Sequence, residues 1–268
     1  MLTTTLDGLW VLQVLSGVEV LAPELGLRPH LPSVESPQAA LAHPAATELS
    51  AAGVIDAAGA VDQTVLEWLT VLSRRDVALL VYVQTPTADA EQERILLARF
   101  AHWWVTLERY GSQVRISGAG SASSEQSAGR LIAAEVERLC GQMPPAPLKP
   151  VAVAVEELLG GVRDAGSLRT FLVERRFDSD QIALLSLAAD SARSAQASLV
   201  AIQSGVTNGP DRRQIGSGTV TIIDTPRGRL ASEHVTREGK SWMIVGPGSA
   251  GSIASAVLTM LRNLPAHE

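Results

Sequence analysis

The residues with the clearest potential for chemistry are the glycines of Gly246-Pro-Gly-Ser-Ala-Gly251, which match the Gly-x-Gly-x-x-Gly pattern of dinucleotide-binding turns. In such a turn the backbone amides hold a pyrophosphate, and an acidic residue about 20 positions further on binds the ribose. Here Pro247 lacks an amide hydrogen, and no further parallel strand follows before Glu268. We therefore expect a tight strand-to-helix turn, and a small-molecule or nucleotide-binding enzyme that uses 246–251 is kept as the alternative function.

The histidines show no pattern of metal ligation. They are His30, His43, His102, His234 and His267, and none is paired with another at the i, i+4 spacing that places two ligands on one helix face. A Cys-x-x-Cys pair is also absent, because the chain has one cysteine. The sequence predicts neither a metal site nor a cofactor.

Two further side chains could take part in catalysis. Asp224 lies near the end of an apolar strand pattern and is the best candidate for a general acid or base, although aspartate is also common just before a turn. Cys140 closes a helical pattern, where the negative end of the helix dipole disfavours a thiolate. Acyl transfer would need a nucleophile elbow such as Gly-x-Ser-x-Gly with a partner histidine, and neither is present. We expect no catalytic residues and no enzymatic activity.

The elements around the glycine motif occur twice in the chain. Arg115-Ile-Ser-Gly-Ala-Gly-Ser-Ala122 and Met243-Ile-Val-Gly-Pro-Gly-Ser-Ala250 are similar, and each follows several strand patterns and precedes a long amphipathic helix. This spacing of about half the chain indicates an ancient duplication. The predicted fold is α+β, with two quasi-repeated halves around a central, mostly antiparallel sheet flanked by helices. The halves are residues 1–143 and 151–268, joined by a proline-rich segment at 144–150 into one continuous globular body.

The hydrophobic periodicity predicts the elements of each half. Asp62 is the expected N-cap of one helix, and Ser167 and Ser179 are the expected caps of two short helices. Tight turns at 226–228 and 237–239 indicate an antiparallel meander. The expected strands are 2–6, 76–85, 95–109, 114–117, 196–203, 219–225, 229–236 and 241–245, and the expected helices include 127–140, 168–175, 180–189 and 252–264.

Composition narrows the class of partner. The 268 residues are 46% hydrophobic, carry a net charge of −6 and contain two lysines, Lys149 and Lys240. Nucleic-acid binding, which depends on clustered basic residues, is not expected. No apolar run approaches the ~20 residues of a membrane-spanning helix, and no signal peptide is apparent. A lone cysteine fits a reducing compartment. We expect a cytoplasmic protein with no membrane insertion that acts on another protein.

An uncharged surface is the best candidate for such a contact. In two neighbouring strand patterns, small hydroxyl and aliphatic side chains alternate with core positions, which suits the apolar tip of a partner. An ordinary solvated sheet face would give the same pattern, and both interpretations stay open. The adjacent tryptophans Trp103 and Trp104 are expected on opposite faces of their strand. The candidate partner-binding residues of the two strands are Gln196, Ser198, Val200, Thr219, Thr221 and Ile223, with Ile202 on the same side of the first strand.

The whole chain resembles the EspG proteins of the ESX (type VII) secretion systems of actinobacteria. The resemblance rests on Thr5-Leu-Asp-Gly-Leu-Trp10, Ala22-Pro-Glu-Leu25, Val220-Thr-Ile-Ile-Asp-Thr-Pro-Arg-Gly-Arg229, Ser241-Trp-Met-Ile244 and the closing Leu264-Pro265. Each motif alone is weak, and their order and spacing together are specific. The family has two quasi-equivalent α+β halves, in agreement with the duplication.

The resemblance implies a cytosolic chaperone that binds a specific PE-PPE heterodimer at the tip of the PPE protein and keeps it soluble for secretion. Such work requires no catalysis, and we expect no cofactor and a weak homodimer of the unbound protein. By position, Ser198 and Thr221 correspond to contact positions of the family, where other members have a charged side chain in place of Ser198. The loop 86–92, with Thr87 and Asp89, is a further expected contact.

Overall fold

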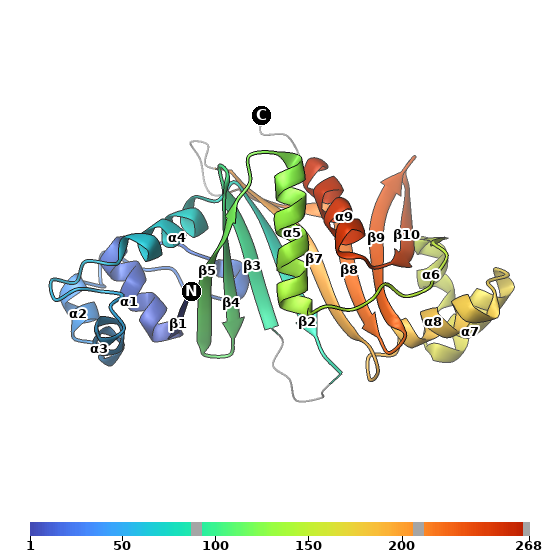
Figure 1. Ribbon diagram of the computed structural model, residues 1–268, viewed down its shortest axis with the longest axis horizontal. Coiled ribbons are helices and arrows are strands. Elements are labelled where there is room, and N and C mark those ends of the chain that lie inside the picture. Colours follow the sequence, from blue (N-terminus) through green and yellow to red (C-terminus); the bar gives the residue numbers. More distant parts are fainter. Residues whose placement is uncertain (87–92, 206–211, 265–268) are drawn as a thin grey trace. The chain divides into compact units, whose positions relative to one another are not determined.

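The computed structural model describes residues 1–86, 93–205 and 212–264, and these fold into two compact units (Figure 1). Unit 1 consists mainly of Met1–Val81 and Glu93–Ser123. Unit 2 consists mainly of Ser124–Ala201 and residues 215–264. The expected division of the chain at 144–150 stays a prediction.

Unit 1 begins with the short strand β1, its helices precede the other four strands, and its strand order is β1-β5-β4-β3-β2. The strands pair antiparallel wherever their register is defined. The elements are β1 (Leu2–Thr5), α1 (Leu6–Ser16), the 3-10 helix η1 (Pro23–Leu25), α2 (Pro37–Leu41), α3 (Pro44–Ala51), α4 (Gln63–Arg74), β2 (Val77–Gln84), β3 (Glu93–Phe100), β4 (Trp103–Tyr110) and β5 (Gln113–Ser121).

Unit 2 repeats this plan, with the strand order β6-β10-β9-β8-β7. In both units the first strand of the series pairs antiparallel with the last, so β6 lies against β10 as β1 lies against β5. The α+β class and its quasi-repeat are therefore confirmed. The elements are α5 (Glu125–Cys140), β6 (Val151–Ala154), α6 (Val155–Gly161), α7 (Ala165–Glu174), α8 (Ser179–Ala188), β7 (Ala195–Gly205), β8 (Arg212–Thr225), β9 (Gly228–Arg237), β10 (Lys240–Pro247) and α9 (Ala250–Arg262).

Helix α4 covers one face of the strands of unit 1. Asp62 caps it as expected, because its side chain accepts hydrogen bonds from the amides of Thr64 and Val65. Val65, Leu69 and Leu72 recur at helical spacing and are buried, and α4 contacts β3, β4 and β5. Each such side chain stabilises the fold by about 1.5–3 kcal/mol on burial, which fixes α4 over the sheet.

The prediction of a single long strand at 95–109 is wrong. The segment forms the hairpin of β3 and β4, whose register pairs Phe100 with Trp103 across a two-residue turn. Ala101 has φ of +55°, a conformation usually taken by glycine or asparagine. The sequence carries no such turn residue, and the apolar pattern continues through the turn.

Two local expectations about a strand end and about caps also need correction. The strand expected at 114–117 runs on to Ser121 as β5, so Gly118 and Gly120, the counterparts of Gly246 and Gly248, lie inside a strand. Helices α7 and α8 are capped by Asp164 and Asp178 in capping boxes, where the side chain of the third helical residue returns to the cap. Ser167, the expected cap, is that third residue in α7, and Ser179 is the first residue of α8.

The core of unit 2 has helices on both faces of its sheet. Helices α5 and α9 pack against each other along their lengths (Figure 1). On the other side, α8 and the proline-rich segment bury a cluster with β6, β9 and β10. Strand β6 and helix α6, which the sequence analysis missed, complete this edge. The buried members of the cluster are Ala146, Leu148, Val151, Leu184, Ala188, Leu230 and Val245.

Candidate functional site

The candidate residues described by the structure lie on one face of two neighbouring strands of unit 2. Along β7 and β8 the side chains alternate between buried and half-buried, as expected for a sheet with one packed face. The buried side includes Leu199 and Ile222. Ile202, which was expected on the same side as Ser198, is buried as well. The half-buried side contains the six predicted residues, Gln196, Ser198, Val200, Thr219, Thr221 and Ile223.

Hydroxyl groups join the two strands at the centre of this face, which we call the β7–β8 face. The hydroxyls of Ser198 and Thr221 are 3.3 Å apart and share a hydrogen bond. The register places Thr221 opposite Ser232 of β9, and Thr219 opposite His234. Polar side chains therefore continue onto β9, where Ser232 is buried and His234 is exposed. The sequence analysis missed both, although they have the same two-residue spacing.

Helix α8 borders the β7–β8 face. The Gln196 side-chain amide donates to the carbonyl of Ala188 at 3.3 Å. Ile223 packs against the cluster that contains Leu184 of α8. Gln196 and Ile223 thus attach α8 to the edge of the β7–β8 face. Ser198 and Thr221, at the centre of the face, are half-buried. The six residues carry no ionisable side chain, so a partner could cover them at little electrostatic cost.

The other two predicted contacts, Thr87 and Asp89, lie outside the described residues.

The glycine motif serves close packing of the chain. Gly246 lies within β10, which ends at Pro247, Gly248 lies in the turn and Gly251 lies within α9. A Cβ on Gly248 would stand 2.6 Å from Cγ of Arg229 and 2.7 Å from the carbonyl carbon of Leu230. The Gly248 amide donates to the Arg229 carbonyl at 2.8 Å, so a phosphate could not use it.

Asp224 holds a structural ion pair. Its two carboxylate oxygens accept from Nε and Nη2 of Arg229 at 2.6 and 2.8 Å. Nη2 also donates to the carbonyl of Cys140 at 2.8 Å, at the end of α5. The side-chain hydrogen bond to Asp224 raises the pKa of Arg229, and burial raises the pKa of the Cys140 thiol. Asp224 and the backbone at Cys140 are thus joined through the Arg229 side chain.

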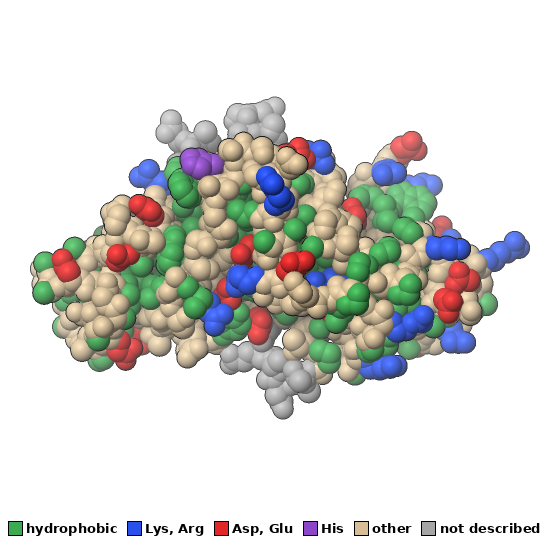
Figure 2. Space-filling view, viewed as in Figure 1, with side chains coloured by type: hydrophobic (Ala, Val, Ile, Leu, Met, Phe, Trp, Pro, Cys, Tyr) green, Lys and Arg blue, Asp and Glu red, His purple; other side chains and the backbone are tan. Residues whose placement is uncertain are grey.

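Within the described ranges, no three His, Cys, Asp or Glu side chains gather closely enough to hold a metal ion. Over the same ranges, no helix is both long and apolar enough to cross a membrane. On the face seen in Figure 2, basic and acidic side chains are interspersed with hydrophobic ones.

Sequence comparison decides the family. The sequence profile of the EspG family matches residues 5–258. The chain belongs to the EspG family. One EspG relative, the ESX-2 secretion-associated protein EspG2 of Mycobacterium tuberculosis, is 51% identical over 271 positions, which cover 100% of this chain and 97% of EspG2. The ESX-5 secretion-associated protein EspG5 of Mycobacterium marinum is 24% identical, with 100% and 95% of the two chains covered.

A solved EspG structure has the same fold. It is the Mycobacterium tuberculosis type VII secretion system chaperone EspG5 in complex with a PE25-PPE41 dimer. The match has a TM-score of 0.77 at 23% identity and covers 100% of this chain and 98% of the other. The resemblance to EspG proteins noted from sequence motifs is confirmed.

Proposed function

We propose that this EspG family member is a cytosolic chaperone that binds a PE-PPE heterodimer at the tip of the PPE protein and keeps it soluble for type VII secretion. The relative at 51% identity is named for ESX-2, whereas the ESX-5 relatives are 24% identical. The proposal therefore includes service to an ESX-2-type system. The solved EspG5 complex with PE25-PPE41 supports the class of partner.

The observation that carries the proposed contact is the β7–β8 face. Its centre, Ser198 and Thr221, is half-exposed, uncharged and held in position by the inter-strand hydrogen bond. A helical tip with apolar side chains could cover such a surface without burying an unpaired charge. Thr87 and Asp89 are proposed as additional contacts. The proposal requires no catalytic group and no cofactor.

The test is co-expression with candidate PE-PPE pairs, followed by size-exclusion chromatography with light scattering. We expect a complex of one chaperone with one heterodimer for some pairs and not for others. Thr221→Arg would place an uncompensated charge in the contact and weaken binding by about 2–4 kcal/mol. Thr47→Arg is the matched control, because Thr47 is exposed on α3 of unit 1. Unchanged binding by a folded Thr221→Arg variant would exclude Thr221 from the interface.

A further inference from the structure

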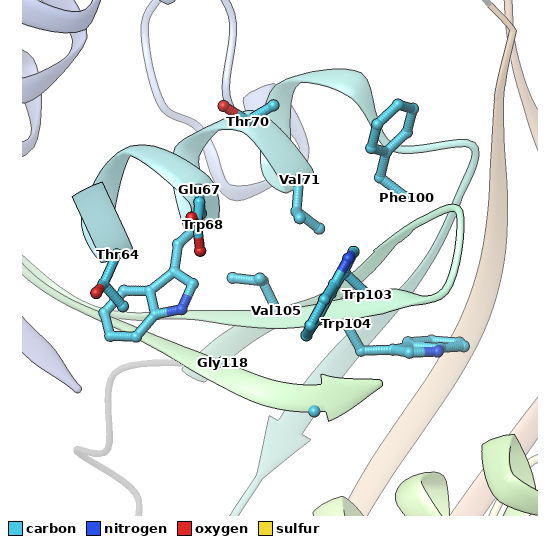
Figure 3. A pocket seen from close by; sticks show the side chains of 11 residues that line it. Thr64, Glu67, Trp68, Thr70, Val71, Phe100, Trp103, Trp104, Val105 and Gly118 are labelled. Atoms are coloured by element: carbon cyan, nitrogen blue, oxygen red, sulfur yellow. The ribbon is translucent and has the colours of Figure 1, made fainter. Parts of the chain in front are cut away.

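A cavity of about 630 Å³ opens in unit 1 between α4 and the ends of β3, β4 and β5. This volume is within the ~300–1,000 Å³ typical of ligand sites. Figure 3 shows side chains from α4 and from the strands meeting across it. The lining is largely aromatic and aliphatic and includes one ionisable side chain, that of Glu67. The other side chains that the argument uses are Trp68, Val71, Trp103 and Val105.

Trp103 keeps a large apolar surface open to solvent at this cavity. It is 53% exposed, whereas its neighbour Trp104 is 1% exposed. Trp103, Trp104 and Val105 all line the cavity, and Figure 3 shows the indoles of Trp103 and Trp104 pointing in different directions. The pairing of β4 with β5 shifts register between Trp104 and Val105. An exposed indole beside an apolar cavity is typical of a contact surface.

The edge of β5 next to the cavity is open. Strand β1 pairs with β5 only from Gln113 to Ile116. The amide of Leu6 donates to the carbonyl of Ser112, so the even-numbered residues direct their backbone groups toward β1. Gly118 is the next residue in this alternation, and no described strand pairs with it on that side. Its amide and carbonyl are available to an added strand.

Glycines keep the route from this edge into the cavity clear. A Cβ on Gly118 would stand 3.0 Å from Nε1 of Trp68, so even alanine would crowd the indole. Gly120, which also lines the cavity, has φ of +122°, a conformation that only glycine adopts easily. A side chain that enters from the edge would pass over two residues without side chains before it reaches Trp103.

The equivalent place in unit 2 is already filled by an extended segment of the chain. Gly246 is the counterpart of Gly118 in the repeated motif, and a Cβ on it would lie 3.6 Å from Pro150, just before β6. In this segment Ala146 and Leu148 are buried, while Lys149 is exposed. The occupant in unit 2 is thus an extended polypeptide with apolar anchors and a basic residue beside them.

We infer that the cavity of unit 1 is a docking site for an extended segment of a partner polypeptide. The segment lies along the edge of β5 at Gly118 and inserts an apolar side chain between α4 and Trp103. Glu67, the one ionisable side chain of the lining, favours a basic residue next to that anchor. The cavity shares no residue with the β7–β8 face, so the proposed chaperone function does not depend on it.

The experiment uses the full chain and fluorescein-labelled heptapeptides that alternate threonine with apolar residues, with lysine at both ends. The central residue is tryptophan, leucine or alanine. Fluorescence polarisation gives the affinity, and NMR reports the Gly118 amide. We expect the tryptophan or leucine peptide to bind, to shift the Gly118 amide, and to lose binding when its backbone amides are N-methylated. Trp103→Ala should weaken binding by about tenfold or more. Glu67→Lys should weaken it severalfold, and more so at low salt.

Two variants serve as controls for peptide binding. Leu159→Ala removes an apolar side chain that is 66% exposed in unit 2, and Glu48→Lys reverses an exposed charge on α3, so both should leave binding within twofold. Binding of the N-methylated peptide with unchanged affinity would overturn the strand pairing. Failure of every peptide to bind would overturn the docking site. A wild-type dimer that Trp103→Ala dissociates would assign the surface to a second copy of this chain and overturn a heterologous partner.

Discussion

Removal of the Asp224 carboxylate is expected to destabilise the protein without changing any residue of the β7–β8 face. Asp224 lies at the end of β8 and pairs through both oxygens with Arg229, whose side chain is 2% exposed. Arg229 also holds the carbonyl of Cys140 at the end of α5. The pair therefore links the β8–β9 hairpin to the segment that leaves α5.

The magnitude follows from the burial of the two charges. Opposite charges about 4 Å apart attract by about 4 kcal/mol at an effective dielectric constant of about 20. Asp224→Ala would leave the Arg229 charge buried without a partner, a change that costs about 3–5 kcal/mol. Because the Asp224 side chain is 17% exposed and water can partly replace it, we expect the lower part of this range, about 3 kcal/mol. For a chain of this size that lowers Tm by about 6–12 °C.

Urea unfolding followed by circular dichroism gives the free energy of unfolding. The matched control is Glu157→Ala, which breaks the pair of Glu157 with Arg175, whose side chains are 46% and 47% exposed. Such surface pairs contribute about 0–1 kcal/mol. Replacing Asp224 and Arg229 together by leucine and methionine should recover part of the loss, because no charge then remains buried. Equal losses for Asp224→Ala and Glu157→Ala would refute the reasoning.

Two further predictions concern pH and the glycine turn. Hydrogen bonds from the Leu31 amide and then from His30 lower the pKa of Glu35 to about 2, so its stabilising contribution is complete above its ordinary value of 4.5 and is lost as the pH falls toward 2. Glu35→Gln should flatten the acid-unfolding curve between these values, and a curve as steep as that of wild type would contradict the assignment. Gly248→Ala should cost about 1–3 kcal/mol in urea unfolding because its Cβ meets the Leu230 backbone, whereas Gly251→Ala, with no atom within 4 Å, should be neutral or slightly stabilising. Equal stability of the two alanine variants would argue against close packing at Gly248.

The sequence predicted those helices and strands whose ends are marked by nearby residues, such as a helix cap. Asp62 could be identified as a cap because its carboxylate satisfies helix amides without help from distant residues. The turn at Ala101 could not be found, because the left-handed conformation of an alanine is imposed by the pairing of β3 with β4. Strand β6 was missed because four apolar residues after a proline-rich segment give a weak pattern. The duplication itself would have located it, since Leu2–Thr5 needs a counterpart in the second half.

The β7–β8 face was predictable in outline because a two-residue period shows which side chains share a face of a strand. The pairing of Ser198 with Thr221 was not, since it depends on the register between strands far apart in sequence. The same limit hid Ser232, which register alone places opposite Thr221. The structure brings these hydroxyls together through strand register.

The two glycine motifs also show how one duplicated pattern acquires two uses. In unit 2, Gly248 lets the chain pass against the backbone of Leu230, and Pro150 fills the place beside Gly246. In unit 1 the corresponding glycines face Trp68 and an open cavity. If glycine were retained in unit 1 only for packing, Gly118→Ala would lower stability and leave peptide binding unchanged. If the glycines clear a docking route, the same variant must weaken peptide binding by more than its effect on Tm explains, and that difference separates a packing role from a binding role.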